Sequence, residues 1–305
     1  MALAIGIDVG GTNLRIGVFD GLQLVEETRF QADFSEICQN NSANVAWQQI
    51  LNMMEKAIRA VLAKHDAQTI GIGFPGFIDP ASKTIAQSPN LAGLKNVNLA
   101  ANLGQRLAKN VTVENDANAA AYGEFCLAGQ PDGGLIYLGL GTGVGGGLIL
   151  NGKPYAGQHG TAMEVGHIII EPNGRQCGCG NLGCMEQYAS ASGVAASYFN
   201  TTQQQASAVQ IAKLAHEGDL AAQAAFELAA NSLAQALASI LKVVDVQTVV
   251  IGGGMASAWT LMKKSFQQRL DADLIAVLRG KIQIKISTAQ DQAGMLGAAM
   301  LAQKL

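Results

Sequence analysis

The sequence predicts an α/β protein of two domains, each built around a copy of the same β-hairpin. The chain has 305 residues, which is too long for a single small hydrophobic core. Hydrophobic residues make up 49% of it and charged residues 14%, which argues against disorder. Three short apolar runs near the N-terminus, separated by turn residues, predict the first hairpin. Gly11-Thr12 with Gly17 then recurs 130 residues later as Gly141-Thr142 with Gly147, although chance among 36 glycines is the alternative.

The first half of the chain alternates strand and helix patterns. The runs Leu3–Val9, Leu14–Phe19 and Leu22–Thr28 predict three antiparallel strands. Between Asn44 and His65 the apolar residues recur at helical spacing, which predicts a helix with one buried face. The elements expected after it are a strand at Thr69–Phe74, a helix at Leu99–Lys109, a strand at Val111–Glu114 and a helix at Ala117–Phe125.

The second half begins with an uncharged stretch, Gly133–Gly152, which is long enough to resemble a membrane span. Nine of its 20 residues are glycine, however, so it predicts a strand, a turn and a second strand. A polar glycine- and cysteine-rich loop is expected next. The remaining predicted elements are helices through Ala191–Lys242, a buried strand at Val246–Ile251 and a helix at Gly294–Lys304.

Charge and targeting signals limit the possible partners and location. The net charge of −3 leaves no basic face for nucleic acid. Asp8 lies where a signal peptide would have its apolar core, and no basic residue precedes it. We therefore expect a cytoplasmic protein that binds neither nucleic acid nor membrane.

The segment Asp8-Val-Gly-Gly-Thr12 is the first candidate site. Its glycines allow backbone N–H groups to form an anion-binding nest, Thr12 adds a hydroxyl, and Asp8 can hold Mg²⁺ directly or through water. An ordinary hairpin is the alternative, because Asp and Gly are common turn residues.

The second hairpin resembles two known phosphate-binding motifs without fitting either. Gly141 to Gly146 satisfies the dinucleotide pattern, but a strand rather than a helix follows it, which disfavours an NAD-dependent enzyme. Gly147 to Lys153 resembles a P-loop, but Pro154 replaces the Ser or Thr that would bind Mg²⁺. A phosphate-binding hairpin remains.

Asp116 lies at a strand-to-helix junction. Phosphoryl transfer to an alcohol needs a carboxylate that accepts the hydroxyl proton. An aspartate at a helix start is often only an N-cap, so both interpretations stay open.

His167, Cys177, Cys179 and Cys184 have the spacing of a closed tetrahedral Zn²⁺ site. A disulfide is the weaker alternative in a cytosolic chain. Four protein ligands indicate a structural metal and disfavour a zinc-dependent hydrolase. Glu164 and Glu186 flank this cluster and could bind polyol hydroxyls, or they could be solvated surface residues. Cys38 and Cys126 are expected to be buried.

Together these residues resemble the ROK family (repressors, open reading frames and kinases) of sugar kinases, and the resemblance runs essentially end to end. The matching motifs are Asp8-x-Gly-Gly-Thr12, Gly73-Phe-Pro-Gly76, Ser88-Pro-Asn-Leu91, Glu114-Asn-Asp116, Gly141-Thr-Gly-Val-Gly-Gly-Gly147, Glu164-Val-Gly-His167, Cys177-Gly-Cys-Gly-Asn-Leu-Gly-Cys184-Met-Glu186, Gly252-Gly-Gly254 and Gly294-Met-Leu-Gly297. The resemblance implies an actin-like ATPase (ribonuclease H-like) fold with duplicated phosphate-binding hairpins.

The resemblance also implies residue roles. Asp116 becomes the catalytic base. The implied hexose ligands are Gly76, Asn90, Asn115, Asp116, Glu164, His167 and Glu186. The implied ATP and Mg²⁺ residues are Asp8, Gly11, Thr12, Thr142, Gly143, Gly253 and Gly254. His167, Cys177, Cys179 and Cys184 keep the structural Zn²⁺ role.

The expected layout follows from the same resemblance. A small N-terminal domain comprises residues 1–115 with 290–305, and a large C-terminal domain comprises residues 116–289 with the zinc loop and a homodimer surface. The expected reaction is transfer of phosphate from ATP to the 6-hydroxyl of glucose, with N-acetylglucosamine, N-acetylmannosamine and fructose as alternative substrates. A sugar-responsive repressor is the alternative of another class. It is disfavoured because only seven residues precede Asp8, which leaves no room for a DNA-binding module.

Overall fold

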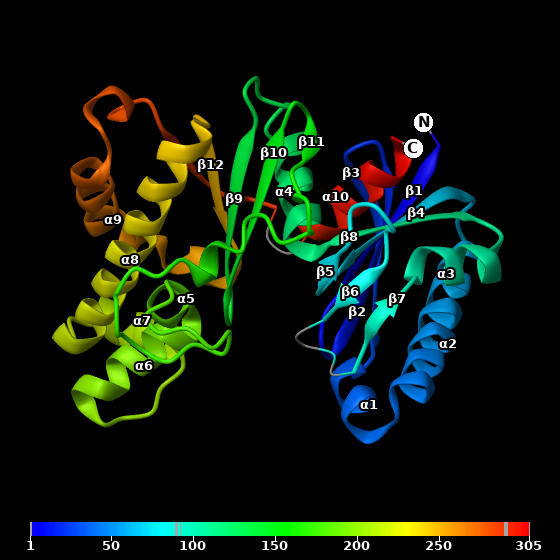
Figure 1. The fold of residues 1–305 in the computed structure, drawn as a ribbon, viewed down its shortest axis with the longest axis horizontal. Helices are drawn as coiled ribbons and strands as arrows, with labels where there is room; N and C mark the ends of the chain where they lie inside the picture. The colour runs from blue at the N-terminus through cyan, green and yellow to red at the C-terminus, as the bar shows by residue number, and fades with distance from the viewer. Residues whose placement is uncertain (1, 89–90, 92, 290–291, 305) are drawn as a thin grey trace. The chain divides into compact units, whose positions relative to one another are not determined.

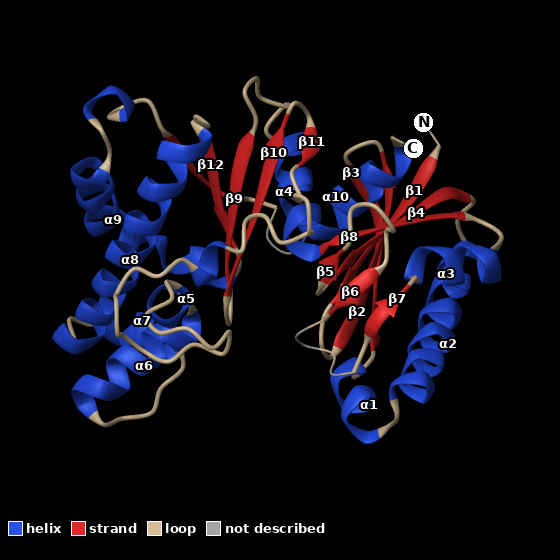
Figure 2. Cartoon of the chain, in the orientation of Figure 1, coloured by secondary structure: helices blue, strands red, loops and turns tan. Residues whose placement is uncertain are grey.

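A computed structural model describes residues 2–88, 91, 93–289 and 292–304. The chain divides into two compact units and contains two five-stranded β-sheets (Figures 1 and 2). Unit 1 comprises Met1–Gly134, Gly147–Ala162 and Asp291–Leu305, and unit 2 comprises Leu135–Gly146 and Met163–Gln290. This division differs from the boundary expected at residue 115, because the helix that follows that residue belongs to unit 1.

The sheet of unit 1 begins with the antiparallel meander expected from the sequence. Strands β1 (Leu3–Val9), β2 (Asn13–Asp20) and β3 (Gln23–Gln31) pair antiparallel in turn. Strands β4 (Ala67–Phe74) and β8 (Asn110–Asn115) extend the sheet in parallel, which gives the order β3-β2-β1-β4-β8. All three parallel strands therefore end at the same edge.

Five helices accompany this sheet in the described residues: α1 (Phe34–Asn40), α2 (Ala43–Leu62), α3 (Leu99–Leu107), α4 (Asp116–Leu127) and α10 (Gln292–Gln303). The apolar face predicted for α2 is confirmed, since Leu51, Met54, Ile58 and Val61 are buried in the core. The sequence did not predict α1 or the small sheet of β5 (Phe77–Ile78), β6 (Ile85–Gln87) and β7 (Lys95–Val97). The latter strands are too short for a periodic pattern.

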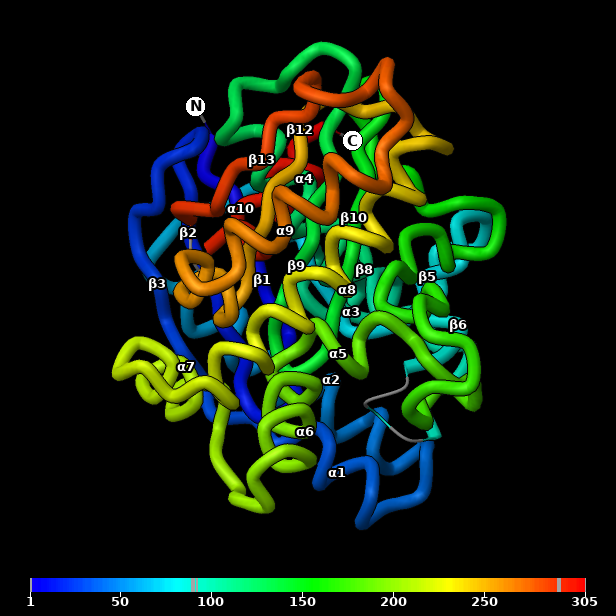
Figure 3. The backbone as a smooth tube through the Cα atoms, turned by 90° about the vertical axis from the view of Figure 1, so that its left-hand side faces the viewer, coloured from blue at the N-terminus to red at the C-terminus, as the bar shows by residue number. Residues whose placement is uncertain are grey.

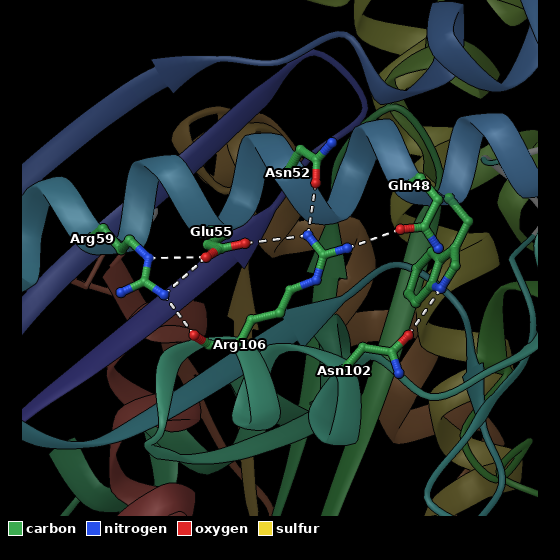
Figure 4. A network of polar contacts seen from close by, with 7 residues as sticks. Gln48, Asn52, Glu55, Arg59, Asn102 and Arg106 are labelled. Carbon is green, nitrogen blue, oxygen red and sulfur yellow. Dashed lines mark hydrogen bonds and ion pairs between the residues drawn. The ribbon is translucent and has the colours of Figure 1, made fainter.

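A polar network ties α2 to α3 (Figure 4). The Arg106 guanidinium donates to Asn52 Oδ1 at 2.7 Å and to Gln48 Oε1 at 2.8 Å, and it lies 3.2 Å from Glu55 Oε2. Arg59 donates to the backbone carbonyl of Arg106 from the other side. These contacts are largely exposed, so each stabilises little, but they fix α3, which leads directly into β8 and the candidate site.

The second sheet repeats the arrangement of the first. It contains β9 (Leu135–Leu140), β10 (Val144–Leu150), β11 (Lys153–Pro154), β12 (Thr248–Gly252) and β13 (Gln283–Ile286) in the order β11-β10-β9-β12-β13. As in the first sheet, a glycine-threonine turn joins the central strand to its antiparallel neighbour, and two parallel strands continue the sheet. The duplicated hairpin predicted from Gly11-Thr12 and Gly141-Thr142 is therefore confirmed.

The helices of unit 2 are α5 (Glu186–Ala189), α6 (Ala191–Thr202), α7 (Ala208–His216), α8 (Leu220–Val244) and α9 (Trp259–Asp273), with 3₁₀ turns at Val165–His167, Gly254–Ala258 and Ala276–Leu278. Among the described residues α8 alone has the length and apolar composition of a membrane span, and 67% of its most apolar window is buried inside the protein. Helix α9 packs beside it (Figure 3). Such burial is typical of a core helix.

Candidate active site

The first group of site residues lies at the carboxyl edge of the unit 1 sheet. Asp8 on β1 is level with Gly73 on β4, and Gly73 is level with Glu114 on β8. Because neighbouring strands are about 4.8 Å apart, the three positions span roughly 10 Å. Ligands of open α/β sheets bind at this edge. The fold thus brings Asp8 and the Asn115-Asp116 segment to one edge, as a shared site requires.

Asp116 is the first residue of α4, and the N-cap is its neighbour Asn115. Asn115 Oδ1 accepts the backbone N–H of Asn118 at 3.0 Å, while Asp116 Oδ1 accepts the N–H of Ala117 at 2.9 Å. The interpretation of Asp116 as the helix cap is therefore wrong. Its carboxylate lies in the first turn, where the helix dipole favours a negative charge.

Asn115 also fixes the turn that contains Gly76. Its amide nitrogen donates to the Gly76 carbonyl at 3.1 Å. That nitrogen carries a second hydrogen that can bind a ligand. A Cβ on Gly76 would lie 2.9 Å from the backbone oxygen of Gln87, so close packing explains this glycine. Asn90, a further expected hexose ligand, lies outside the described residues.

The hairpin of Gly11 and Thr12 is held by the backbone that follows β3. The Gly11 carbonyl accepts the N–H of Ser35 at 3.4 Å, and the Thr12 carbonyl accepts the N–H of Ala32 at 3.1 Å. The Thr12 hydroxyl accepts a bond from Asn13 at 3.1 Å and can still donate its own hydrogen. Both carbonyl groups of the turn are therefore used within the protein.

The hairpin of Thr142 and Gly143 in unit 2 is held in the same way by the start of α6. The Gly141 carbonyl accepts the N–H of Ala191 at 2.9 Å, and the Thr142 carbonyl accepts the Ser192 hydroxyl at 2.6 Å. Helix α6 thus takes the place that the residues around α1 have in unit 1.

Gly253 and Gly254 follow β12, which is level with β9 through the pair Gly252 and Gly139. Gly253 has a φ of +80°, and a Cβ there would lie 2.4 Å from the Leu140 carbonyl oxygen. Apart from its chain neighbours, no atom of the described residues lies within 4 Å of the corresponding point on Gly254. The tight turn leaves the backbone at Gly254 open to a ligand, beside the second hairpin.

The four predicted zinc ligands come together in unit 2. One ligand atom from each of His167, Cys177, Cys179 and Cys184 lies within 4.8 Å of all the others. Cys177 Sγ is 3.6 Å from His167 Nδ1, and Cys179 Sγ is 3.5 Å from Cys184 Sγ. A tetrahedral Zn²⁺ with Zn–S bonds of about 2.3 Å sets its sulfur atoms about 3.8 Å apart and sulfur and nitrogen about 3.6 Å apart.

The chemistry of these ligands also fits a cation. All five cysteines are free, so the disulfide alternative is wrong. Burial, followed by the neighbouring thiols of Cys179 and Cys177, raises the pKa of Cys184 to about 12. A thiolate at this position needs a compensating positive charge, which a zinc ion supplies.

Glu164 lies beside the free side of the His167 ring, and the Glu186 carboxylate is near Glu164. His167 Nδ1 faces Cys177, and its Nε2 lies 3.9 Å from Glu164 Oε2. Burial raises the pKa of Glu164, and the nearby Glu186 carboxylate adds to the rise. Glu186 Oε2 accepts the backbone N–H of Val144 at 2.9 Å. Glu186 is therefore not a freely solvated surface residue, whereas the Glu164 side chain remains 43% exposed, as the surface alternative expects. Both carboxylates can receive hydrogen bonds from a polyol.

Sequence reasoning missed Arg175, which anchors the zinc loop. Its guanidinium donates to the carbonyls of Gln187 at 2.7 Å and Gly193 at 3.1 Å and to Ser197 Oγ at 2.9 Å. It also lies 4.5 Å from the centre of the Tyr188 ring. Burial lowers the pKa of this arginine. A single arginine in a polar loop carries no pattern that could have revealed these contacts.

Two sheets of identical strand order, each with a glycine-threonine hairpin at its central strand, define a two-domain α/β protein with the actin-like ATPase fold. Residues 4–305 match the model of the ROK family. The chain belongs to this family.

Known relatives cover nearly the whole chain. A glucokinase of Thermotoga maritima is 31% identical over 314 residues, covering 97% of this chain and 96% of the relative. An N-acetyl-D-glucosamine kinase of Salmonella paratyphi B is 34% identical over 307 residues, covering 97% and 98%. The crystal structure of a ROK family glucokinase from Streptomyces griseus, in complex with glucose and AMPPNP, matches with a TM-score of 0.82 and 30% identity, covering 100% of both chains.

Proposed function

We propose that this protein is a cytoplasmic, ATP-dependent hexokinase-type phosphotransferase that phosphorylates glucose at the 6-hydroxyl. The position of Asp116 carries the proposal. Its carboxylate stands at the start of α4, on the carboxyl edge of the sheet, in a helix that already has Asn115 as its cap. The full-length similarity to a glucokinase supports the assignment of the substrate.

Asp116 accepts the proton of the attacking hydroxyl in this proposal. The hexose ligands are Gly76, Asn90, Asn115, Glu164, His167 and Glu186. ATP supplies the phosphoryl group, and the residues around the nucleotide and its Mg²⁺ are Asp8, Gly11, Thr12, Thr142, Gly143, Gly253 and Gly254. Zinc at the four-ligand cluster has a structural role, because no position is left for a reacting group.

N-acetylglucosamine is the second candidate substrate, favoured by the 34% identity to an N-acetyl-D-glucosamine kinase. N-acetylmannosamine and fructose are the remaining alternatives. The deciding comparison is kcat/KM for these four sugars and mannose in a coupled assay of ADP formation. Glucose should give the highest value, because a site that bonds each hydroxyl rejects analogues that leave polar groups unpaired. A tenfold advantage for any other sugar would refute glucose, and inactivity on all would refute the kinase.

Replacement of Asp116 by Asn tests the catalytic base. The variant keeps the shape and the bond to Ala117 but cannot accept the proton, so kcat should fall by about 10²–10⁴-fold. Hexose affinity, measured calorimetrically, should stay within a few-fold of the wild-type value. Asp132→Asn, which changes an exposed aspartate, is the matched control. Retention of more than a tenth of wild-type kcat would show that Asp116 is not the base.

We also propose a homodimer built by unit 2, without affinity for nucleic acid or membrane. The net charge of −3 disfavours binding to nucleic acid or membrane. Sedimentation analysis tests the dimer, and a gel-shift assay with genomic fragments tests the repressor alternative. A specific DNA shift would contradict the proposal.

A further inference from the structure

The carboxylate of Glu186 bonds to the backbone of the second hairpin. Its Oε2 accepts the N–H of Val144 at 2.9 Å, and a Cβ built on Gly143 would lie only 2.4 Å from the same oxygen. The side chain therefore packs directly against the turn of Thr142 and Gly143. Glu186 lies two residues after the zinc ligand Cys184, so the zinc loop and the hairpin meet at one carboxylate.

The backbone on both sides of Glu186 is held by hydrogen bonds. Before it, Met185 donates its N–H to the Ile168 carbonyl at 2.9 Å, next to His167. After it, Gln187 donates to Cys177 Sγ at 3.6 Å, and the Gln187 carbonyl accepts Arg175 at 2.7 Å. The backbone that carries Glu186 is thus joined to the zinc cluster on both sides.

The chain that follows Glu186 returns to the same hairpin. The Ser190 hydroxyl donates to the Glu186 carbonyl at 2.7 Å. The next two residues hold the hairpin carbonyls: Ala191 bonds to Gly141 at 2.9 Å and Ser192 to Thr142 at 2.6 Å. Residues 184–192, which we name the bridge segment, therefore begin in the zinc cluster and hold the hairpin at three points.

We propose that the bridge segment couples the hexose ligands of unit 2 to the nucleotide-binding hairpin, with Ser192 as a positioning residue. The inference rests on the proposed function. One oxygen of Glu186 is committed to Val144, and the other can receive a hexose hydroxyl. A hexose that fixes the carboxylate also fixes the hairpin. Since linkage is reciprocal, hexose and nucleotide each raise the affinity for the other.

The test measures hexose and nucleotide affinities separately and together. Titrations of the full-length, zinc-loaded protein with glucose and with a non-hydrolysable ATP analogue give each dissociation constant in the absence and presence of the other ligand. Wild-type protein should show an affinity gain of fivefold or more, the lower end of typical coupling between sites. Ser192→Ala removes the bond to Thr142 without changing a hexose ligand. It should keep the dissociation constant for glucose alone and lose most of the gain.

A second variant changes a residue of the hairpin itself. Gly143→Ala places a methyl group against Glu186 Oε2, the end of a flexible side chain, so the carboxylate can move while the fold survives. This variant should weaken glucose binding in the absence of nucleotide, although residue 143 is not a hexose ligand. Ser207→Ala is the control, since Ser207 also bonds at a helix start but caps α7, away from the hairpin. It should retain the full coupling.

The possible outcomes distinguish failure of the bridge segment from failure of the kinase proposal. Coupling that is unchanged in Ser192→Ala, or glucose affinity that is unchanged in Gly143→Ala, overturns the bridge while the kinase proposal stands. Wild-type protein that binds no hexose overturns both. Loss of coupling in Ser192→Ala, with Ser207→Ala like wild type and equal melting temperatures, supports the bridge.

Discussion

Replacement of Gly297 by Ala should destabilise unit 1 more than a typical methyl insertion. A Cβ on Gly297 in α10 would lie 1.7 Å from the backbone oxygen of Ala119 in α4, whereas ordinary contacts begin near 3.4 Å. The helices would have to separate by roughly the missing 1.7 Å. Helix α10 cannot move away from α4, because its backbone also packs closely against the sheet. A Cβ on Gly6 in β1 or on Gly71 in β4 would lie only 1.8 Å from a carbonyl oxygen of α10.

The expected loss follows from this confinement. Overpacking costs about 1–3 kcal/mol where neighbours can adjust, and backbone on both sides of α10 places Gly297→Ala at about 3 kcal/mol. For a unit of this size the melting temperature should fall by about 6–12 °C. Activity should fall as well, because Asp116 begins the displaced helix α4.

Thermal and urea unfolding followed by circular dichroism would measure the loss. Gly294→Ala is the matched control in the same helix, since its Cβ would meet its nearest atoms at 3.6 Å. It should be neutral or stabilising by up to about 1 kcal/mol, as Ala is the better helix former. Melting temperatures of the two variants within 2 °C of each other, a spread of about 1 kcal/mol or less, would refute the packing argument.

Three further predictions concern the zinc loop and the surface of unit 1. Protein purified without chelator should contain one Zn²⁺ per chain by elemental analysis, and its removal should weaken hexose binding far more than it lowers kcat at saturating hexose; a metal-free form with unchanged affinity would contradict this. Arg175→Met should raise the KM for hexose about tenfold or more by freeing the zinc loop, and Arg175→Lys should rescue little because lysine lacks the planar guanidinium fork. The control is Arg279→Met, which loses a bond to the carbonyl of Leu274 at the end of α9 and should leave the KM unchanged. His65 and then Lys64 hold the pKa of Glu26 at about 2, below its usual 4.5. The stabilisation from Glu26 should therefore be complete above about pH 4.5 and be lost as the pH falls towards 2. The difference in unfolding free energy between wild type and Glu26→Gln should accordingly vanish near pH 2. A difference that grows on acidification would contradict this prediction.

The sequence by itself determined the features that depend on neighbours in the chain. The meander of β1 to β3 follows from alternating apolar runs and turn residues, and the structure contains it. The zinc cluster is equally local, since all four ligands lie within 18 residues of one another. Spacing was sufficient to predict that the four side chains come together, because short loops limit how far apart such residues can fold.

A one-residue distinction was beyond the sequence. Asn115 and Asp116 are both good caps by residue type. Only the backbone conformation decides which one lies outside the helix, and it makes Asn115 the cap.

Helix α9 could have been predicted from the sequence, although it was not. Its buried side carries apolar residues at four-residue spacing, namely Met262, Phe266 and Leu270.

Contacts between distant segments were decided by the tertiary structure alone. The bond from Val144 to Glu186 joins residues 42 positions apart. Gly297 meets Ala119 across most of the chain length, and Arg175 finds its acceptors on α5 and α6. No local pattern specifies such pairs, because each depends on how whole sheets and helices pack before two side chains come within hydrogen-bonding distance.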